Sequence, residues 1–315
     1  MARQSPPYRY LYTYSWALVV YTVIIIGWGA WVRISGSGDG CGDDWPLCKG
    51  MAIPTGEATK TWIEVSHRYS TMLFGLLVLF QVWLVRRVLP RGHLARRWVV
   101  ATLLFTVTEA LIGRLLVVYG LVHESTSHAR LFIMPLHLLN TSLLLFAEVV
   151  VAESILFGER RTRPLSPSMK RVGIATLIGG VLLLTTGAIA ALGSHLFPSL
   201  SLLEGLTKDF THGAHPAVRL RILHPILALT IPLALWYSTS NSPSPTPLEK
   251  MYRGFVVAVM VMLLIGVATL LTLAPAWLKL AHLTMANVLV VLASRCVFHT
   301  LRPPSENVVA SDLTS

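Results

Sequence analysis

The stretch EVSHRYSTMLFGLLVLFQVWLV, Glu64–Val85, decides the fold of this chain of 315 residues. Its apolar part matches the roughly 20 residues that a helix needs to cross the hydrocarbon core of a bilayer. Two ionisable side chains, Glu64 and His67, stand at its head. The segment therefore predicts a membrane helix that carries a chemical site at one end.

Seven further stretches have a similar length and composition. The chain is 54% hydrophobic and only 13% charged, with a mean hydropathy of +0.63, which is too apolar for a water-soluble domain. We therefore predict an all-α integral membrane protein with eight transmembrane helices, the first of them uncleaved because it is too long for the apolar core of a signal peptide. The predicted spans are 11–32, 65–85, 98–119, 131–153, 172–193, 222–238, 254–273 and 278–295.

The basic residues predict the orientation. Of 26 Lys and Arg residues, 16 fall in the segments that share a side with the N-terminus and 8 fall on the other side. Positive charge is enriched in cytoplasmic segments, so both termini are predicted to be cytoplasmic and the first loop to lie outside the cytoplasmic (inner) membrane. This asymmetry of basic residues between the two sides of the membrane accounts for the net charge of +11, so the charge does not indicate a nucleic-acid-binding protein.

Several features recur between the two halves of the chain. His67 recurs 157 positions later as His224, as does the Gly-Ser pair at 36–37, and the Leu-Ile-Gly run at 111–113 recurs 153 positions later. Internal repeats of this kind are common in membrane proteins. We predict two duplicated four-helix bundles, with the units 1–156, a linker 157–171, 172–303 and a tail 304–315.

Each even-numbered span carries one histidine near its outer end, namely His67, His137, His224 and His282. Paired imidazoles inside a four-helix bundle are suited to the two axial positions of haem iron, which predicts two haem pockets. A di-iron site is the natural rival because Glu64 and His67 form one Glu-x-x-His motif, but the sequence contains no second copy. Covalent haem attachment is excluded because the sequence has no Cys-x-x-Cys-His.

Glu64 and two cysteines mark the outer end of the first half. Glu64 lies one helical turn before His67, where a carboxylate can take up protons or stabilise developing positive charge, or can simply be a favourable charge near a helix start. Cys41 and Cys48 share the predicted outer loop, so a disulfide is feasible as either a constraint or a labile bond. Cys296 is predicted to be a buried small residue.

Other polar residues of the outer level have two interpretations. Five arginines near the histidines are candidate partners of haem propionates, or interfacial side chains that reach towards water. His195, His212 and His215 are predicted to lie in a solvated loop of the second half. The five arginines are Arg68, Arg114, Arg130, Arg219 and Arg221.

These motifs resemble the haem A synthase family over essentially all eight spans. SGSGDGCGDDWPLCKG, at 35–50, is similar to the first-loop motif of the family, and Glu64-Val-Ser-His67-Arg68 is similar to its Glu-x-x-His-Arg motif. His137, His224 and His282 match the other family histidines by position.

The resemblance implies a division of labour. The first half would hold the substrate haem O on His67 and His137, with Glu64 closest to catalysis, and the second half would hold haem b on His224 and His282. The implied reaction oxidises the methyl group on porphyrin carbon 8 to a formyl group, with oxygen from water, for cytochrome oxidase assembly. The implied partners are a haem O synthase that supplies the substrate, an electron acceptor, and further copies of this chain in a homo-oligomer.

The sequence departs from the family pattern in three features, and two other functions compete with the one that the resemblance implies. Pro225 follows His224 where Arg68 follows His67, the second half lacks a cysteine pair, and the charged Glu109 and Arg114 of the third span are predicted to pair locally. A quinol-linked bis-haem b electron-transfer protein needs the four histidines but neither Glu64 nor the cysteine loop. A transporter is favoured only by the duplication.

Overall fold

The protein is all-helical in the residues described by the computed structural model, which are 6–55, 58–122, 125–157, 167–240 and 246–301. Eight helices of the described part are long and apolar enough to cross a membrane, which confirms the predicted multi-pass membrane fold. The helices in chain order are α1 Pro6–Ile34, α2 Thr59–Val88, α3 Leu94–Val118, α4 His128–Phe157, α5 Pro167–Leu196, α6 Leu202–Phe210, α7 Pro216–Leu220, α8 Leu223–Ser240, α9 Pro247–Leu271 and α10 Ala276–Leu301.

Two short helices, α6 and α7, occupy a region that the sequence predicted as a loop. They are too short to cross a membrane, so the search for long apolar stretches did not find them. A local signal was present, because the Ser201 hydroxyl accepts a hydrogen bond of 3.2 Å from the Glu204 backbone N–H, the contact of a helix N-cap. His215 likewise caps α7 by accepting from the Ala217 N–H at 3.2 Å.

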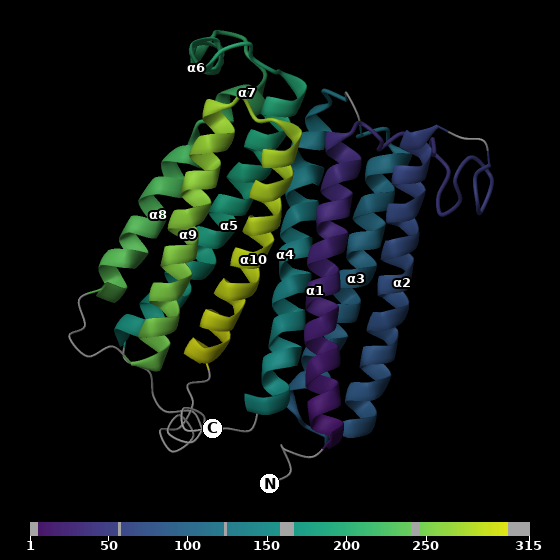
Figure 1. The fold of residues 1–315 in the computed structure, drawn as a ribbon, viewed down its shortest axis with the longest axis vertical. Coiled ribbons are helices and arrows are strands. Elements are labelled where there is room, and N and C mark those ends of the chain that lie inside the picture. The colour runs from purple at the N-terminus through teal and green to yellow at the C-terminus, as the bar shows by residue number, and fades with distance from the viewer. Residues whose placement is uncertain (1–5, 56–57, 123–124, 158–166, 241–245, 302–315) are drawn as a thin grey trace.

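The spanning helices form two groups that lie side by side (Figure 1). Helices α1 to α4 pack together, as do α5, α8, α9 and α10, and the groups meet where α4 contacts α5 and α10 and where α1 contacts α10. Helix α4 is central, with 78% of its most apolar window buried. The duplication and the unit boundaries remain predictions; α5 begins inside the predicted linker, and the tail 304–315 lies outside the described residues.

An ionic cluster joins the two groups near one end of the bundle. Glu153 of α4 is fully buried and accepts a 2.7 Å hydrogen bond from Arg295 Nε of α10, and its other oxygen lies 3.0 Å from His299 Nε2. The Arg295 guanidinium also stands 5.5 Å from the ring centroid of Trp16 in α1. A buried carboxylate requires such partners, because charge is costly away from water.

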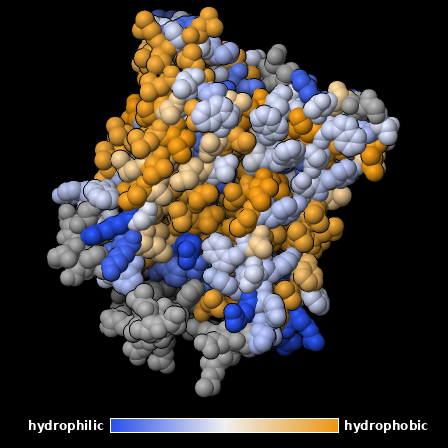
Figure 2. Space-filling model, in the orientation of Figure 1, coloured by the Kyte–Doolittle hydropathy of each residue, from blue (hydrophilic) through white to orange (hydrophobic). Residues whose placement is uncertain are grey.

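The surface has the distribution expected in a bilayer. Figure 2 shows apolar residues over much of the visible face, including its upper left, and the most hydrophilic residues mainly in its lower part. Polar side chains inside the bundle bond to each other, as Thr22 does to Glu148 at 2.9 Å and Gln81 to Ser15 at 3.2 Å. Helix α1 begins and α10 ends at one end, whereas the connection between α1 and α2 lies at the opposite end (Figure 1).

Candidate functional site

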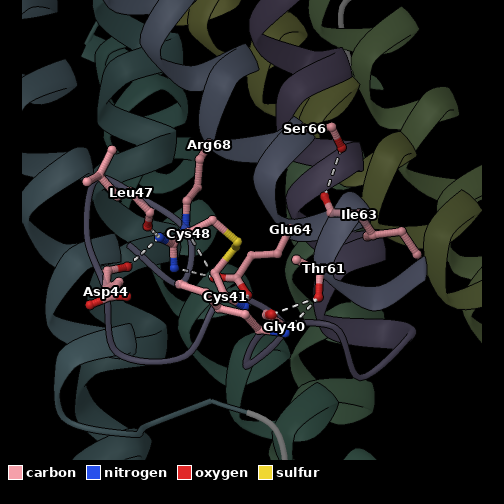
Figure 3. The surroundings of a disulfide bond; sticks show 11 residues. Gly40, Cys41, Asp44, Leu47, Cys48, Thr61, Ile63, Glu64, Ser66 and Arg68 are labelled. Carbon is pink, nitrogen blue, oxygen red and sulfur yellow. Dashed lines mark hydrogen bonds and ion pairs between the residues drawn. A yellow bond between two sulfur atoms is a disulfide. The ribbon is translucent and has the colours of Figure 1, made fainter. Parts of the chain in front are cut away.

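A disulfide joins Cys41 and Cys48 in the loop between α1 and α2, as the sequence allowed. Both cysteines are buried, and they form a small apolar cluster with Val65 of α2. Figure 3 shows the disulfide beside the start of α2. The loop lies directly on the start of α2, because a Cβ at Gly40 would stand 2.7 Å from the Lys60 carbonyl oxygen. Thr61 adds a 2.9 Å hydrogen bond from its hydroxyl to the Gly40 carbonyl.

Glu64 and Arg68 connect this loop to the membrane helix. Glu64 is 3% exposed, and its carboxylate accepts from the Cys41 backbone N–H at 2.9 Å and from Arg68 Nε and Nη2 at 3.1 and 2.5 Å. Arg68 Nη1 donates to the carbonyl oxygens of Asp44 and Leu47 at 2.5 and 2.6 Å (Figure 3). The carboxylate that the sequence singled out is therefore held in place by charge-assisted bonds from one arginine and one backbone amide.

Each of the four span histidines packs its ring against a glycine of a neighbouring helix. A Cβ added to Gly29 would meet the ring of His67 at 2.9 Å, and one added to Gly187 would meet His224 at 3.0 Å. The remaining two contacts, measured in the same way, are Gly266 to His282 at 3.2 Å and Gly113 to His137 at 3.9 Å. Because glycine has no side chain, each of these positions leaves space for the imidazole ring of the neighbouring helix. The repeated Leu-Ile-Gly run included two of these glycines, but Gly29 and Gly187 were not identified from sequence.

The second group of helices brings His224 and His282 together. Their ring centroids are 6.4 Å apart and the ring planes are inclined by 83°. A metal held about 2 Å from one nitrogen of each imidazole requires centroids roughly 6 Å apart. The Nδ1 atom of His282 is buried without a hydrogen-bond partner. The pair therefore fits the two axial positions of haem iron.

The first group surrounds its histidines with different chemistry. The Nδ1 atoms of His67 and His137 are both buried without a hydrogen-bond partner, but His137 Nδ1 also lies at an ion-pair distance of 3.3 Å from the Glu109 carboxylate. The predicted pairing of Glu109 with Arg114 is wrong: Glu109 faces α4, and the Arg114 guanidinium stands 5.7 Å from the centroid of the Trp45 ring. Residues five positions apart on a helix point to different faces, which explains this separation.

The five candidate propionate arginines have different surroundings. Arg68 holds Glu64 and the loop, and Arg221 donates to Asp209 at 2.5 Å and to the Gly205 carbonyl at 2.8 Å, which fixes α6. Arg130 is 1% exposed and donates to the Ser125 carbonyl at 2.9 Å. Arg68 and Arg221 thus already bind acidic groups of this chain, which spacing along the sequence could not reveal.

The outer histidines of the second half are not in a simple loop. His195 belongs to α5, and His215, besides capping α7, has its Nε2 3.2 Å from the Thr126 carbonyl oxygen of the first half. His212 lies exposed between α6 and α7. Among the residues that the structure describes, no group of three His, Cys, Asp or Glu side chains gathers as for a metal ion.

The fold and the site place the chain among multi-pass membrane proteins built around histidines at the ends of spanning helices. Residues 12–294 match the cytochrome oxidase assembly protein family, COX15-CtaA, and the chain belongs to this family. A protein of Thermus thermophilus named "Protoheme IX farnesyltransferase" is 35% identical over 291 residues, which are 90% of this chain and 47% of that protein.

Proteins named "Heme A synthase" are also similar, which agrees with the resemblance drawn from the motifs. The protein of Halalkalibacterium halodurans is 36% identical over 145 residues, 45% of each chain. That of Alkalihalophilus pseudofirmus is 32% identical over 165 residues, 52% of each chain. The matches span about half the length of these curated relatives.

Alanine at Gly29 is expected to displace the His67 ring, because the new Cβ would meet it at 2.9 Å. For the haem binding by His67 that is proposed below, we expect roughly tenfold weaker retention, the size of effect produced by disturbing groups that orient metal ligands. Haem per chain after purification measures this. Gly75→Ala is the matched control, since nothing lies within 4 Å of a Cβ there. Equal haem content in the two variants would contradict the steric role of Gly29.

Proposed function

We propose that this chain is a haem A synthase, which oxidises the methyl group on carbon 8 of haem O to a formyl group. The observation that carries the proposal is the buried Glu64, three residues before His67 and beneath the disulfide loop, in a member of the cytochrome oxidase assembly protein family. The naming of several relatives as "Heme A synthase" supports the same activity.

In this proposal the first half binds the substrate haem O. His67 and His137 would hold its iron, and Glu64 would act on the methyl group that reacts. The methyl carbon and, in net balance, one water give the formyl group with release of four electrons and four protons. The reaction passes through the alcohol and then the hydrate of the aldehyde, whose formation takes up a second water and which loses one water to form the aldehyde. Glu64 stabilises positive charge that develops on the carbon and accepts protons, roles for which a positioned carboxylate is suited.

The second half holds haem b on His224 and His282. When bound there, haem b would supply one-electron transfer from the first half towards an electron acceptor. The chain contributes the two imidazoles at 6.4 Å between centroids, and the glycines Gly187 and Gly266 against which the rings pack. The Thr186 hydroxyl, 3.3 Å from His224 Nδ1, orients one of the rings.

Two exposed arginines are the better candidates for propionates. Arg114 and Arg219 are proposed as propionate partners ahead of Arg68 and Arg221, whose guanidinium groups already bind acidic side chains. The loop with Cys41 and Cys48 is proposed to face the extracytoplasmic side of the inner membrane, on the basis of the asymmetry of basic residues.

A haem O synthase is proposed as the donor of the substrate. The relative named "Protoheme IX farnesyltransferase" supports this. The match takes in 90% of the present chain but only 47% of that protein, so more than half of the protein that carries this name lies outside the part similar to the present chain. The product would serve cytochrome oxidase assembly, in keeping with the family description.

Haem extraction from the purified protein tests the activity. Co-expression with a haem O synthase should give haem B together with haem O, haem A or hydroxylated intermediates, identified by chromatography and mass. Two equivalents of haem B per chain, with no haem A in competent membranes, would instead establish a bis-haem b electron-transfer protein. The close His224–His282 pair is compatible with that second function, whereas Glu64 and the loop are not needed for it.

A further inference from the structure

The four span histidines differ in what faces their Nδ1 atoms. The Nδ1 atoms of His67 and His282 are buried without a hydrogen-bond partner. His224 Nδ1 lies 3.3 Å from the Thr186 hydroxyl, and His137 Nδ1 lies 3.3 Å from Oε1 of Glu109. The His137 contact has ion-pair distance but not the angle of a hydrogen bond, and its partner is a carboxylate.

Glu109 is fixed in place by α4. The Thr141 hydroxyl donates to Oε1, and Asn140 Nδ2 donates to Oε2 at 2.6 Å. Asn140 is itself held, since it donates to the Phe105 carbonyl at 3.0 Å and accepts from the Thr108 hydroxyl at 2.7 Å. An acidic side chain inside a membrane bundle is costly without such donors, so these residues form a dedicated site for a carboxylate.

The second half has no counterpart of this site. The repeated Leu-Ile-Gly run has an offset of 153 positions, which gives the residue equivalent to Glu109. His137 and His282 are 145 positions apart, and this offset gives the residues equivalent to Asn140 and Thr141. None of the three equivalent residues has an acidic side chain, and none has a side chain that can donate the hydrogen bonds that Asn140 and Thr141 donate to Glu109. The equivalent residues are Met262, Met285 and Ala286.

We propose that Glu109 is a positioning residue that orients His137 and strengthens it as a ligand of porphyrin iron; this rests on the proposed binding of haem by His137. An imidazole that binds iron through Nε2 carries its proton on Nδ1, and the Glu109 carboxylate lies 3.3 Å from that atom. A carboxylate partner raises the basicity of a metal-bound imidazole. A stronger donor stabilises the ferric state, so Glu109 lowers the reduction potential of the first-half haem relative to that of the second half.

The test compares Glu109→Gln, Glu109→Asp and the unaltered protein, each purified with its haems. Redox titration followed by visible spectra gives both potentials, and electron paramagnetic resonance of the ferric protein reports the ligand field of each haem. Glu109→Gln should raise one potential and change one low-spin signal, while the haem held by His224 and His282 stays unchanged. Glu109→Asp should give a smaller shift in the same direction, and it serves as the measurement if the Gln variant does not fold.

Glu148→Gln is the matched control, because Glu148 is a fully buried acid of α4 that bonds to Thr22 of α1. It should leave both potentials unchanged. Unchanged potentials and signals in a haem-loaded Glu109→Gln protein would overturn the positioning role. The result is independent of haem A formation: a chain that holds two haem B groups and makes no haem A would refute the proposed activity, yet could still show the shift.

Discussion

Replacing Glu64 with glutamine is expected to lower haem A formation by about 100-fold or more, the range of a positioned acid–base group. The substitution keeps the size of the side chain but removes the charge that the Cys41 N–H and Arg68 now bind at 2.5 to 3.1 Å. The measurement is the ratio of haem A to haem O extracted from membranes that also contain a haem O synthase. Haem B in the second half should stay at its original level.

A control must separate chemistry at Glu64 from disturbance of the loop. Thr61→Val removes the 2.9 Å hydrogen bond to the Gly40 carbonyl, another contact between the loop and α2, without touching Glu64. We expect haem A formation within about twofold of the unaltered protein, because one neutral hydrogen bond contributes only about 1 kcal/mol. If Thr61→Val were as inactive as Glu64→Gln, Glu64 would act through the loop rather than on the substrate.

Replacing His282 with alanine is expected to remove haem B from the purified protein while haem O remains. The loss should exceed about 100-fold in affinity, since even the outer partners of metal ligands contribute 10- to 100-fold. The change also deletes one member of the pair whose ring centroids lie 6.4 Å apart. Haem analysis and reduced-minus-oxidised spectra measure the two haems separately.

His212→Ala is the matched control for this loss, because His212 is an exposed histidine of the same half that lies in the connection between α6 and α7. It should retain haem B at the level of the unaltered protein. Loss of both haems from His282→Ala, with the chain still folded, would refute the proposed assignment of one haem to each half.

Much of the architecture was predictable because membrane insertion is governed by length and hydropathy. The segment from Glu64 to Val85 and its seven counterparts all correspond to observed helices. The short helix α6 was missed because a search for long apolar stretches does not detect amphipathic helices of 9 residues. The cysteine pair was recognised as feasible from its spacing and shared loop, and the disulfide confirms it.

The contacts of the site were less predictable because they join residues far apart in the chain. Glu109 and His137 lie on different helices, and no periodicity relates them, so the sequence suggested Arg114 as the partner of Glu109 instead. Likewise, Gly29 has no distinctive sequence signal, and only helix packing brings it to His67. The role of Arg221 in fixing α6 through Asp209 also depends on a fold that spacing does not determine.

The sequence by itself determined the number of membrane spans, one histidine in the outer part of each even-numbered span and the position of Glu64 one turn before His67. These features follow from local rules, namely the thickness of the hydrocarbon core and the pitch of the helix. Only the tertiary structure decided which groups meet, such as the loop amide with Glu64 and the carboxylate of Glu109 with His137. The reason is that side-chain contacts between helices depend on the rotation and depth of each helix, which packing sets across the whole bundle.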